Sequence, residues 1–315
     1  MKQVAFVFPG QGSQQVGMGD LFLAESQQAR SLFEKADQIL GFPISTMMSE
    51  GPEELLTETK YAQPALLLVS TMILEQLTAV GVTPTVVAGH SLGEYSALVA
   101  ANVLTFEEAI QLVHQRGKLM ESADPEGQGG MAAVLGLDQQ VIEEQLSSMT
   151  ETVELANINC PGQIVISGTK TAIDAAVTLL KDAGAKRVIP LNVSGPFHSS
   201  LMQPVANDYE ELLTPIHFND ANIPIYSNVT AEKVTDAEVI KSLLVKQLYS
   251  PVRFHEIINH LVAEQLDAIV EVGNGKVLSG LVKKVSRRAK VFSVQDPASF
   301  QDFINWYKGE GNNDK

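Results

Sequence analysis

The pentapeptide Gly89-His90-Ser91-Leu92-Gly93 contains the residues whose types and spacing most directly predict chemistry. It follows Val86-Val87-Ala88, which is typical of a short buried strand, and it precedes a helical pattern. A strand-to-helix turn flanked by glycines lets the central serine side chain stand clear of the backbone. The helix N-terminus offers N–H groups and a positive dipole to an oxygen that becomes negative during acyl transfer, and the Leu92 amide is the expected donor. Ser91 is therefore a candidate nucleophile, and the alternative is an inert serine in a glycine-rich turn.

A serine hydroxyl becomes a good nucleophile only when a base removes its proton, and histidine is the usual base. His198 stands out because it follows Gly195-Pro196-Phe197, at a junction loop of the kind that readily builds a cleft. The other histidines are weaker candidates. His90 adjoins the serine, His114 and His260 lie inside helical patterns, and His217 and His255 have no local signature. From the local sequence alone, a catalytic and a non-catalytic His198 remain equally open.

Short strand-like runs alternate with longer helical patterns, which is typical of an α/β fold with a parallel sheet. Strands are expected at 4–8, 85–88, 224–226, 268–272 and 291–294. Helices are expected at 22–40, 65–80 (with Pro64 suited to the first turn), 92–101, 106–120, 199–213, 236–248, 254–265, 276–288 and 298–307. The tail, residues 309–315, is expected to be disordered.

A different pattern follows residues 125–130, a glycine-rich segment that we interpret as a hinge. Strands are expected at 131–136, 152–158, 163–167 and 186–190, and helices at 138–148 and 170–183. This order, βαββαβ, is that of ferredoxin-like domains. The sequence therefore predicts a large α/β-hydrolase-like body, residues 1–127 and 196–315, with a small ferredoxin-like subdomain inserted at 128–195.

Composition narrows the function classes. The balance of 45% hydrophobic and 19% charged residues in 315 is ordinary for a globular chain with a substantial core. Residues 1–8 lack a secretory pattern, and the apolar runs are shorter than the roughly 20 residues that span a membrane. The single cysteine, Cys160, favours a reducing cytoplasm. A net charge of −15 opposes binding to nucleic acid or anionic lipid, so an acidic partner needs a local basic patch.

Five separated motifs occur in one order along the chain: Phe8-Pro9-Gly10-Gln11-Gly12-Ser13-Gln14, Gly89-His90-Ser91-Leu92-Gly93-Glu94-Tyr95, Arg116-Gly117, Gly195-Pro196-Phe197-His198-Ser199 and Gln247-Leu248-Tyr249-Ser250-Pro251-Val252. Together they closely resemble the bacterial malonyl-CoA:acyl carrier protein transacylases of type II fatty acid synthesis, from the first strand to about residue 295. One departure is Asn274, where the resemblance leads us to expect proline. Asparagine suits the same turn geometry, so the departure puts little in doubt.

The resemblance implies a role for each matching residue. Ser91 is the implied acylated nucleophile, and His198 its general base and later its acid. The backbone amides of Gln11 and Leu92 are the implied oxyanion hole. Gln247 supplies a hydrogen-bond acceptor that orients the histidine, in place of a triad aspartate. Two further positions line the implied substrate pocket, Met120 and Asn159.

Arg116 is the residue that decides the implied substrate. Its planar guanidinium can bind the free carboxylate of a malonyl group through two hydrogen bonds and so select malonyl-CoA over acetyl-CoA. The alternative is an arginine whose stem covers apolar neighbours at the surface. Phe197 is expected to limit room for an α-methyl group. No cofactor or metal is expected, because coenzyme A and phosphopantetheine enter as parts of the substrates.

A basic cluster stands out in this acidic chain: Lys283, Lys284, Arg287, Arg288 and Lys290. Positions 283/287 and 284/288 share faces of the helix expected at 276–288. The cluster is either a solvated helix C-terminus or a docking site for acyl carrier protein, the acidic partner that the resemblance implies. Lys186 and Arg187 are candidates to extend it.

Two other functions stay open. An α/β-hydrolase-type esterase or thioesterase also has Gly-x-Ser-x-Gly followed later by histidine. It predicts an acidic triad member between Ser91 and His198 and no role for Arg116. A non-catalytic scaffold that only binds carrier protein predicts that Ser91 is never acylated.

Overall fold

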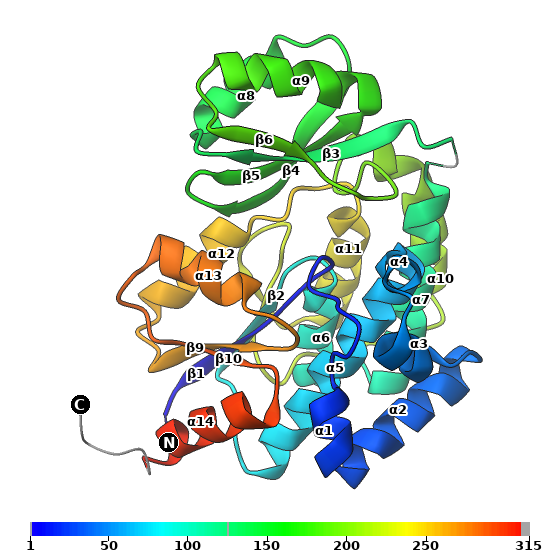
Figure 1. Ribbon diagram of the computed structural model, residues 1–315, viewed down its shortest axis with the longest axis vertical. Helices are drawn as coiled ribbons and strands as arrows, with labels where there is room; N and C mark the ends of the chain where they lie inside the picture. Colours follow the sequence, from blue (N-terminus) through cyan, green and yellow to red (C-terminus); the bar gives the residue numbers. More distant parts are fainter. Residues whose placement is uncertain (1, 125, 310–315) are drawn as a thin grey trace.

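Two separate sheets organise the computed structural model, which describes residues 2–124 and 126–309 (Figure 1). The large sheet has the strand order β10-β9-β1-β2-β7-β8, and the small sheet has the order β4-β5-β3-β6. The architecture is thus α/β, with one mostly parallel sheet and one antiparallel sheet. Within the described residues, no helix is long and apolar enough to span a membrane.

The large sheet is parallel except at one edge, where β8 runs antiparallel to β7. Its strands are β1 (Val4–Phe8), β2 (Val86–Gly89), β7 (Ile225–Tyr226), β8 (Lys233–Val234), β9 (Ala268–Val272) and β10 (Val291–Val294). β1, β2 and β9 are buried at every residue, as expected for parallel strands covered on both faces. Because Phe8 pairs with Gly89, the segments that follow β1 and β2 leave the sheet side by side.

Helices cover both faces of the large sheet. They are α1 (Asp20–Glu25), α2 (Gln27–Leu40), α3 (Ile44–Glu50), α4 (Glu53–Thr57), α5 (Thr59–Ala79), α6 (Gly93–Ala100), α7 (Phe106–Ser122), the 3₁₀ helix η1 (Ser200–Val205), α10 (Ala206–Leu213), α11 (Ala237–Gln247), α12 (Phe254–Ala263), α13 (Val277–Val285) and α14 (Pro297–Lys308). Successive side chains of β1 point to opposite faces of the sheet. Phe6 and Phe8 join the core with α2, α5, α6 and α7, whereas Ala5 and Val7 pack with α12 and α13.

The small sheet lies over one end of the large body, with its two helices on the far side (Figure 1). Its elements are β3 (Gly129–Leu135), α8 (Gln139–Ser147), β4 (Val153–Cys160), β5 (Gln163–Thr169), α9 (Lys170–Asp182) and β6 (Arg187–Pro190). All its strand pairs are antiparallel. β4 also bonds to the large body, because Ile158 N–H donates to Val252 O at 2.9 Å and Val252 N–H donates to Ala156 O at 2.8 Å.

The contact between α5 and α7 positions the arginine of the third motif. The helix expected from residue 65 begins at Thr59, and Pro64 lies inside it. Proline has no N–H, so the carbonyl of Lys60 lacks its helical partner, and the His114 ring bonds to it at 2.7 Å. Gly117 lets the two helices touch, because a Cβ there would lie 2.6 Å from Lys60 Cα.

Several expected elements differ from those observed. The helix expected at 22–40 is two helices, because Ser26 ends α1 and accepts a hydrogen bond from Ala29 N–H as the N-cap of α2. The helix expected at 199–213 begins as η1, which contains Pro204. The short elements α3, α4 and β8 were not predicted, and β8 makes the sheet mixed rather than parallel. Residues 310–315 of the expected tail lie outside the described residues.

Candidate active site

Ser91 occupies the turn between β2 and α6 with a φ of 50°, in the left-handed region that non-glycine residues rarely adopt. The flanking glycines are required by close contacts. A Cβ on Gly89 would lie 1.9 Å from the Gly93 carbonyl carbon, and one on Gly93 would lie 2.0 Å from Phe8 O. The turn is therefore pressed against itself and against the end of β1, which fixes the direction of the serine side chain.

Asn228, which follows β7 and is distant in the sequence, stabilises this strained turn through two hydrogen bonds. Its Oδ1 accepts from Ser91 N–H at 2.7 Å, and its Nδ2 donates to Gly89 O at 2.7 Å. The side chain is completely buried, so both bonds are made away from water. Such strain costs about 1–3 kcal/mol and persists only where the surroundings enforce it. Asn228 supplies that enforcement, and no local signal in the sequence pointed to it.

His198 lies directly against the serine, with Nε2 2.8 Å from Ser91 Oγ. Its Nδ1 is 2.8 Å from the backbone carbonyl of Gln247, which can only accept, so Nδ1 carries the proton and Nε2 is free to accept from the serine hydroxyl. Burial, helped by the charge of Arg116, lowers the pKa of His198 to about 3. The ring is therefore neutral at physiological pH, the state in which it can take a proton.

Arg116 is fully buried beside the same hydroxyl, not at the surface. Its Nη1 donates to Gln63 Oε1 at 2.8 Å, and its Nη2 donates to Gln247 Oε1 at 2.9 Å and to Ser91 Oγ at 3.3 Å. Over residues 2–124 and 126–309, no carboxylate forms an ion pair with the guanidinium, and its Nε–H has no partner. A buried cation held only by neutral groups favours an anionic ligand.

Two backbone N–H groups near the serine are available to donate hydrogen bonds. The structure records no hydrogen bond from Gln11 N–H or Leu92 N–H to any other described residue. The loop that carries Gln11 touches the serine turn, since a Cβ on Gly10 would lie 2.3 Å from His90 O. Asn274 Nδ2 donates to Ser13 O at 2.7 Å and so ties this loop down. The arrangement brings together the candidate nucleophile Ser91, a neutral histidine, two N–H groups without a recorded partner and a buried cation.

Comparison with known proteins shows the family of this chain. The acyl transferase domain family matches residues 5–298. The chain is also 50% identical over 316 residues to the malonyl CoA-acyl carrier protein transacylase of Bacillus subtilis (strain 168), across 99% of this chain and 100% of the relative. This chain belongs to the malonyl CoA-acyl carrier protein transacylase family.

Solved transacylase structures share the fold. An acyl carrier protein S-malonyltransferase from Vibrio cholerae O1 is 42% identical, with a TM-score of 0.93 over 96% of this chain and 99% of the other. A malonyl-transacylase solved in complex with its type II PKS acyl-carrier protein is 40% identical, with a TM-score of 0.94 over 98% and 99% of the two chains.

The other residues that were expected from the sequence at the substrate pocket lie near this group. Met120 Sδ accepts a hydrogen bond from Gln63 Nε2, the same amide whose oxygen contacts Arg116. Asn159, on β4 of the small sheet, bonds to His90 Nε2 at 2.8 Å through its Oδ1. Phe197 is buried next to His198. His90 thus faces the small sheet and not the serine, as expected from its position in the turn.

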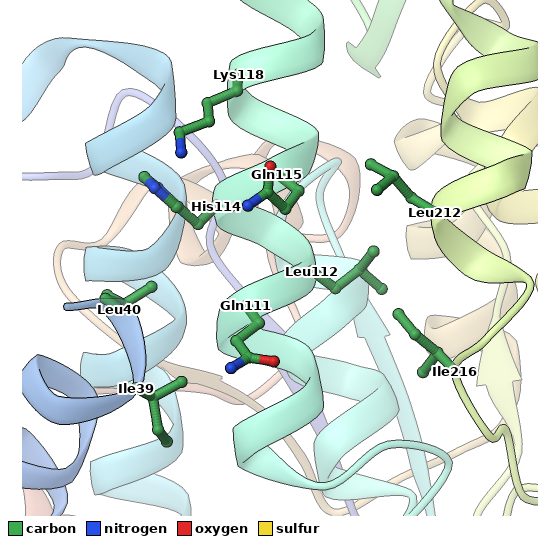
Figure 2. A pocket seen from close by; sticks show the side chains of 9 residues that line it. All are labelled: Ile39, Leu40, Gln111, Leu112, His114, Gln115, Lys118, Leu212 and Ile216. Carbon is green, nitrogen blue, oxygen red and sulfur yellow. The ribbon is translucent and has the colours of Figure 1, made fainter.

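The other histidine near this region serves packing. The His114 ring bonds to Lys60 O and lies against the rings of Phe42 and Tyr61. It lines a surface groove of about 410 Å³ formed by α7, the end of α2 and the segment after α10 (Figure 2). Neither Ser91 nor His198 lines this groove, so His114 is not placed to act as the base.

Three residues in contact with this group had no predicted role: Asn228, Gln63 and Glu94. Gln63 lies within α5 with no local signature, and its only distinguishing feature is a polar side chain in an otherwise apolar helical run. Glu94 stood inside the second motif, three residues after the serine. It lies in the first turn of α6, and its side chain is buried.

Proposed function

We propose that this chain transfers malonyl groups from malonyl-CoA to the phosphopantetheine thiol of acyl carrier protein through an ester on Ser91. The observation that carries the proposal is the buried Arg116 guanidinium, which contacts the same oxygen atom as His198. A site that places a cation next to an activated serine is suited to an acyl group that ends in a carboxylate. The names of the relatives support this substrate and this acceptor.

In the first half-reaction, His198 Nε2 takes the proton as Ser91 Oγ attacks the thioester carbonyl carbon. The carbonyl oxygen gains negative charge, which the amides of Gln11 and Leu92 stabilise. The intermediate then collapses, the C–S bond breaks, and His198 returns the proton to the sulfur of coenzyme A. The malonyl carboxylate replaces Ser91 Oγ as a partner of Arg116.

In the second half-reaction, His198 takes the proton from the phosphopantetheine thiol, whose sulfur attacks the malonyl ester. Collapse of this intermediate breaks the C–O bond to Ser91, and His198 protonates the serine oxygen. Every step uses side chains and amides of this chain, so we propose that the transacylase needs no metal or other cofactor. Such a cycle suits a cytoplasmic enzyme that supplies fatty acid synthesis.

The hydrolase alternative fits less well. It requires an acidic triad member to orient the histidine, whereas His198 Nδ1 bonds to the backbone carbonyl of Gln247. The resemblance implied that Gln247 supplies a hydrogen-bond acceptor for the histidine. In the structure, the group that contacts His198 Nδ1 is the backbone carbonyl of Gln247. The Gln247 side chain instead contacts Arg116 and Glu94.

We propose finer assignments for the two sheets. The order β4-β5-β3-β6 with both helices on one face supports a ferredoxin-like subdomain at residues 128–195, inserted in an α/β-hydrolase-like body of residues 1–127 and 196–315. The insertion contributes Asn159 to the site and ends just before Phe197 and His198, so it forms one wall of the proposed pocket.

The function is tested by the fate of malonyl-CoA with and without holo acyl carrier protein. We expect rapid formation of malonyl-carrier protein and only slow release of free malonate when the carrier is left out. Rapid malonate release without the carrier would favour the thioesterase, and no turnover in either case would favour a scaffold.

The pH dependence of Ser91 acylation follows from the lowered pKa of His198. Because the folded protein keeps this ring neutral down to about pH 3, kcat/KM for malonyl-CoA should not fall between pH 7.5 and 5. In Arg116→Ala, the pKa of His198 should rise, because the charge of Arg116 contributes to the lowering. Stopped-flow acylation across this pH range checks both. An acid limb centred near 6.5, the ordinary histidine pKa, would contradict the assignment of a buried neutral base.

Asn274 should act through the loop that carries Gln11. Asn274→Pro restores the residue expected from the resemblance but removes the 2.7 Å bond to Ser13 O. We expect kcat for acylation to fall about three- to tenfold, because one lost hydrogen bond costs about 1 kcal/mol and loosens a proposed oxyanion donor. Asn274→Asp should have the same effect, because a carboxylate has no N–H group to donate to Ser13 O. A change in KM alone would argue against a role in transition-state stabilisation.

We propose that acyl carrier protein docks on the basic cluster. Lys284 Nζ donates to Gln163 Oε1 at 2.6 Å, beside the β4–β5 turn, and the Lys186 side chain packs over Gly136, whose N–H bonds to the same turn. The cluster therefore continues from α13 onto the small sheet. The expected helical pairing with 287 and 288 is wrong, because α13 ends at Val285 and the two arginines lie in the turn beyond it. None of these basic side chains forms an ion pair within the described residues.

Reversing two of these charges tests the docking surface. Lys284→Glu with Arg287→Glu should slow transfer to carrier protein about tenfold or more, because charge complementarity drives such encounters, while malonylation of Ser91 by malonyl-CoA stays unchanged. The matched control is Lys170→Glu with Lys181→Glu on α9, which alters the net charge equally. Equal rates of both half-reactions in the two double variants would refute docking at this cluster.

A further inference from the structure

Glu94 is a buried acid that the proposed cycle does not use. It lies in the first turn of α6 and is 3% exposed. Its Oε2 accepts from Gln247 Nε2 at 2.7 Å and from Asn228 N–H at 3.2 Å. No lysine, arginine or histidine forms an ion pair with it in the part of the chain that the structure describes. Its partners are therefore neutral donors, which leaves its charge uncompensated by direct contact.

The Gln247 amide links Glu94 to Arg116. Its Nε2 donates to the carboxyl of Glu94, and its Oε1 accepts from Arg116 Nη2. In the reverse orientation, an NH₂ group would face the guanidinium, and an oxygen would face the Glu94 carboxyl, which repels it when the acid is ionised. Gln247 Nε2 also donates to Ser91 O at 3.1 Å and to Asn228 Oδ1 at 3.3 Å, and its contact with Glu94 is the shortest of the three. Glu94 thus helps to fix which way the amide points, and the amide in turn holds one nitrogen of Arg116.

Charge adds a second effect to this geometry. Burial raises the pKa of Glu94 to about 7, although its hydrogen bonds from Asn228 and Gln247 and the charge of Arg116 act in the opposite direction. The acid is thus mostly neutral at pH 6 and mostly ionised at pH 8. When ionised, it offsets part of the positive potential that Arg116 presents to a ligand carboxylate.

The neighbouring titratable groups keep their charge over that range. The pKa of Tyr95, on the same helix, and that of Tyr209, on α10, are both raised by burial. The pKa of His198 is about 3, and burial lowers that of His90 as well. Glu94 is therefore the group around Arg116 whose pKa, about 7, lies inside the range from pH 6 to 8.

We propose that Glu94 is a positioning residue that sets how strongly the site prefers an acyl group with a free carboxylate. It aligns Arg116 through Gln247, and its ionisation weakens the attraction of Arg116 for that carboxylate. This inference rests on the proposed malonyl transfer. It predicts that malonyl selectivity falls as the pH rises, through a group that touches neither the substrate nor the reacting atoms.

The test is the ratio of kcat/KM for malonyl-CoA to kcat/KM for acetyl-CoA at pH 6, 7 and 8. Both substrates carry the same coenzyme A, so ionisation of its phosphates cancels in the ratio. In the wild type, the ratio should fall about three- to thirtyfold from pH 6 to 8. In Glu94→Gln, which keeps an acceptor for Gln247 but has no charge, it should not change with pH and should exceed the wild-type ratio at pH 8.

Two further variants separate charge from alignment. Glu94→Ala removes the acceptor for Gln247, so it should lose more kcat/KM with malonyl-CoA than with acetyl-CoA at every pH. Glu271→Gln is the matched control, because Glu271 is also a buried acid with a raised pKa but contacts Leu278 and Ser279 at the start of α13. It should keep the pH dependence of the wild type.

The inference is overturned by a pH-independent ratio in the wild type, by an equal pH dependence in Glu94→Gln, or by equal losses with both substrates in Glu94→Ala. The wild-type series decides it even where a variant fails to fold. Absence of a malonyl adduct on Ser91 would instead refute the proposed function. A normal adduct with a pH-independent ratio would refute only the role of Glu94.

Discussion

His198→Ala should slow formation of the malonyl ester on Ser91 by about 10³-fold or more, with little change in the binding of malonyl-CoA. The serine hydroxyl lies 2.8 Å from His198 Nε2, and no other histidine reaches it in the described structure. General-base catalysis contributes about 10²–10⁴-fold, and removal of one member of a nucleophile–base pair costs at least as much. Rapid-quench measurement of the ester at saturating malonyl-CoA gives the rate constant directly.

The control for this variant is His217→Ala, which removes an exposed imidazole that bonds only to Asn219 in the described structure. It should acylate at the wild-type rate. If His198→Ala retained wild-type acylation while remaining folded, the proposed base would be wrong, and another proton acceptor would have to be sought.

Arg116→Ala should abolish most of the preference for malonyl-CoA over acetyl-CoA. A charge-assisted hydrogen bond contributes about 1.5–3 kcal/mol, so loss of two such contacts should lower the ratio of kcat/KM values by about 10²-fold or more. The acetyl reaction should change far less, because an acetyl group has no carboxylate to bind. Steady-state kinetics with the two thioesters measures the ratio.

Arg116→Lys is the informative partner of this variant. It keeps the charge but loses the planar fork that contacts Gln63 and Gln247, so it should have an intermediate ratio. If the alanine variant lost activity equally with both thioesters, Arg116 would be structural, and the preference for a free acid would have to arise elsewhere.

The nucleophile turn was predictable because its information is local. Two glycines and a serine at alternate positions, between a strand-like and a helical run, are sufficient to indicate a tight bend. The structure places Ser91 there at a positive φ. What the local sequence did not contain is the restraint on that bend, since Asn228 is 137 positions away and reaches the turn only through the order of the strands in the sheet.

The position of the base depended on long-range geometry in the same way. His198 is held by Gln247 O, 49 positions downstream, and local residues left its role open. The five-motif resemblance supplied what the local pattern lacked. Even so, it left Glu94 without a role, because Gln247, which joins Glu94 to Arg116, lies 153 and 131 positions from them in the sequence.

The errors in the predicted fold have physical causes. Pro64 suggested the first turn of a helix, yet α5 begins five residues earlier, because the His114 ring satisfies the carbonyl that proline leaves free. The antiparallel strand β8 has only two residues, too few to give a pattern. The helix expected to reach residue 288 stops at Val285, which moves Arg287 and Arg288 from its surface into a turn.

The central claim is that Ser91 carries the malonyl group between coenzyme A and the carrier protein. Intact mass after brief exposure to malonyl-CoA, followed by peptide mapping, tests it most directly. The account predicts a single malonyl adduct on Ser91 that holo acyl carrier protein removes, and no adduct on Ser91→Ala. An adduct at another residue, or undiminished transfer by Ser91→Ala, would contradict it.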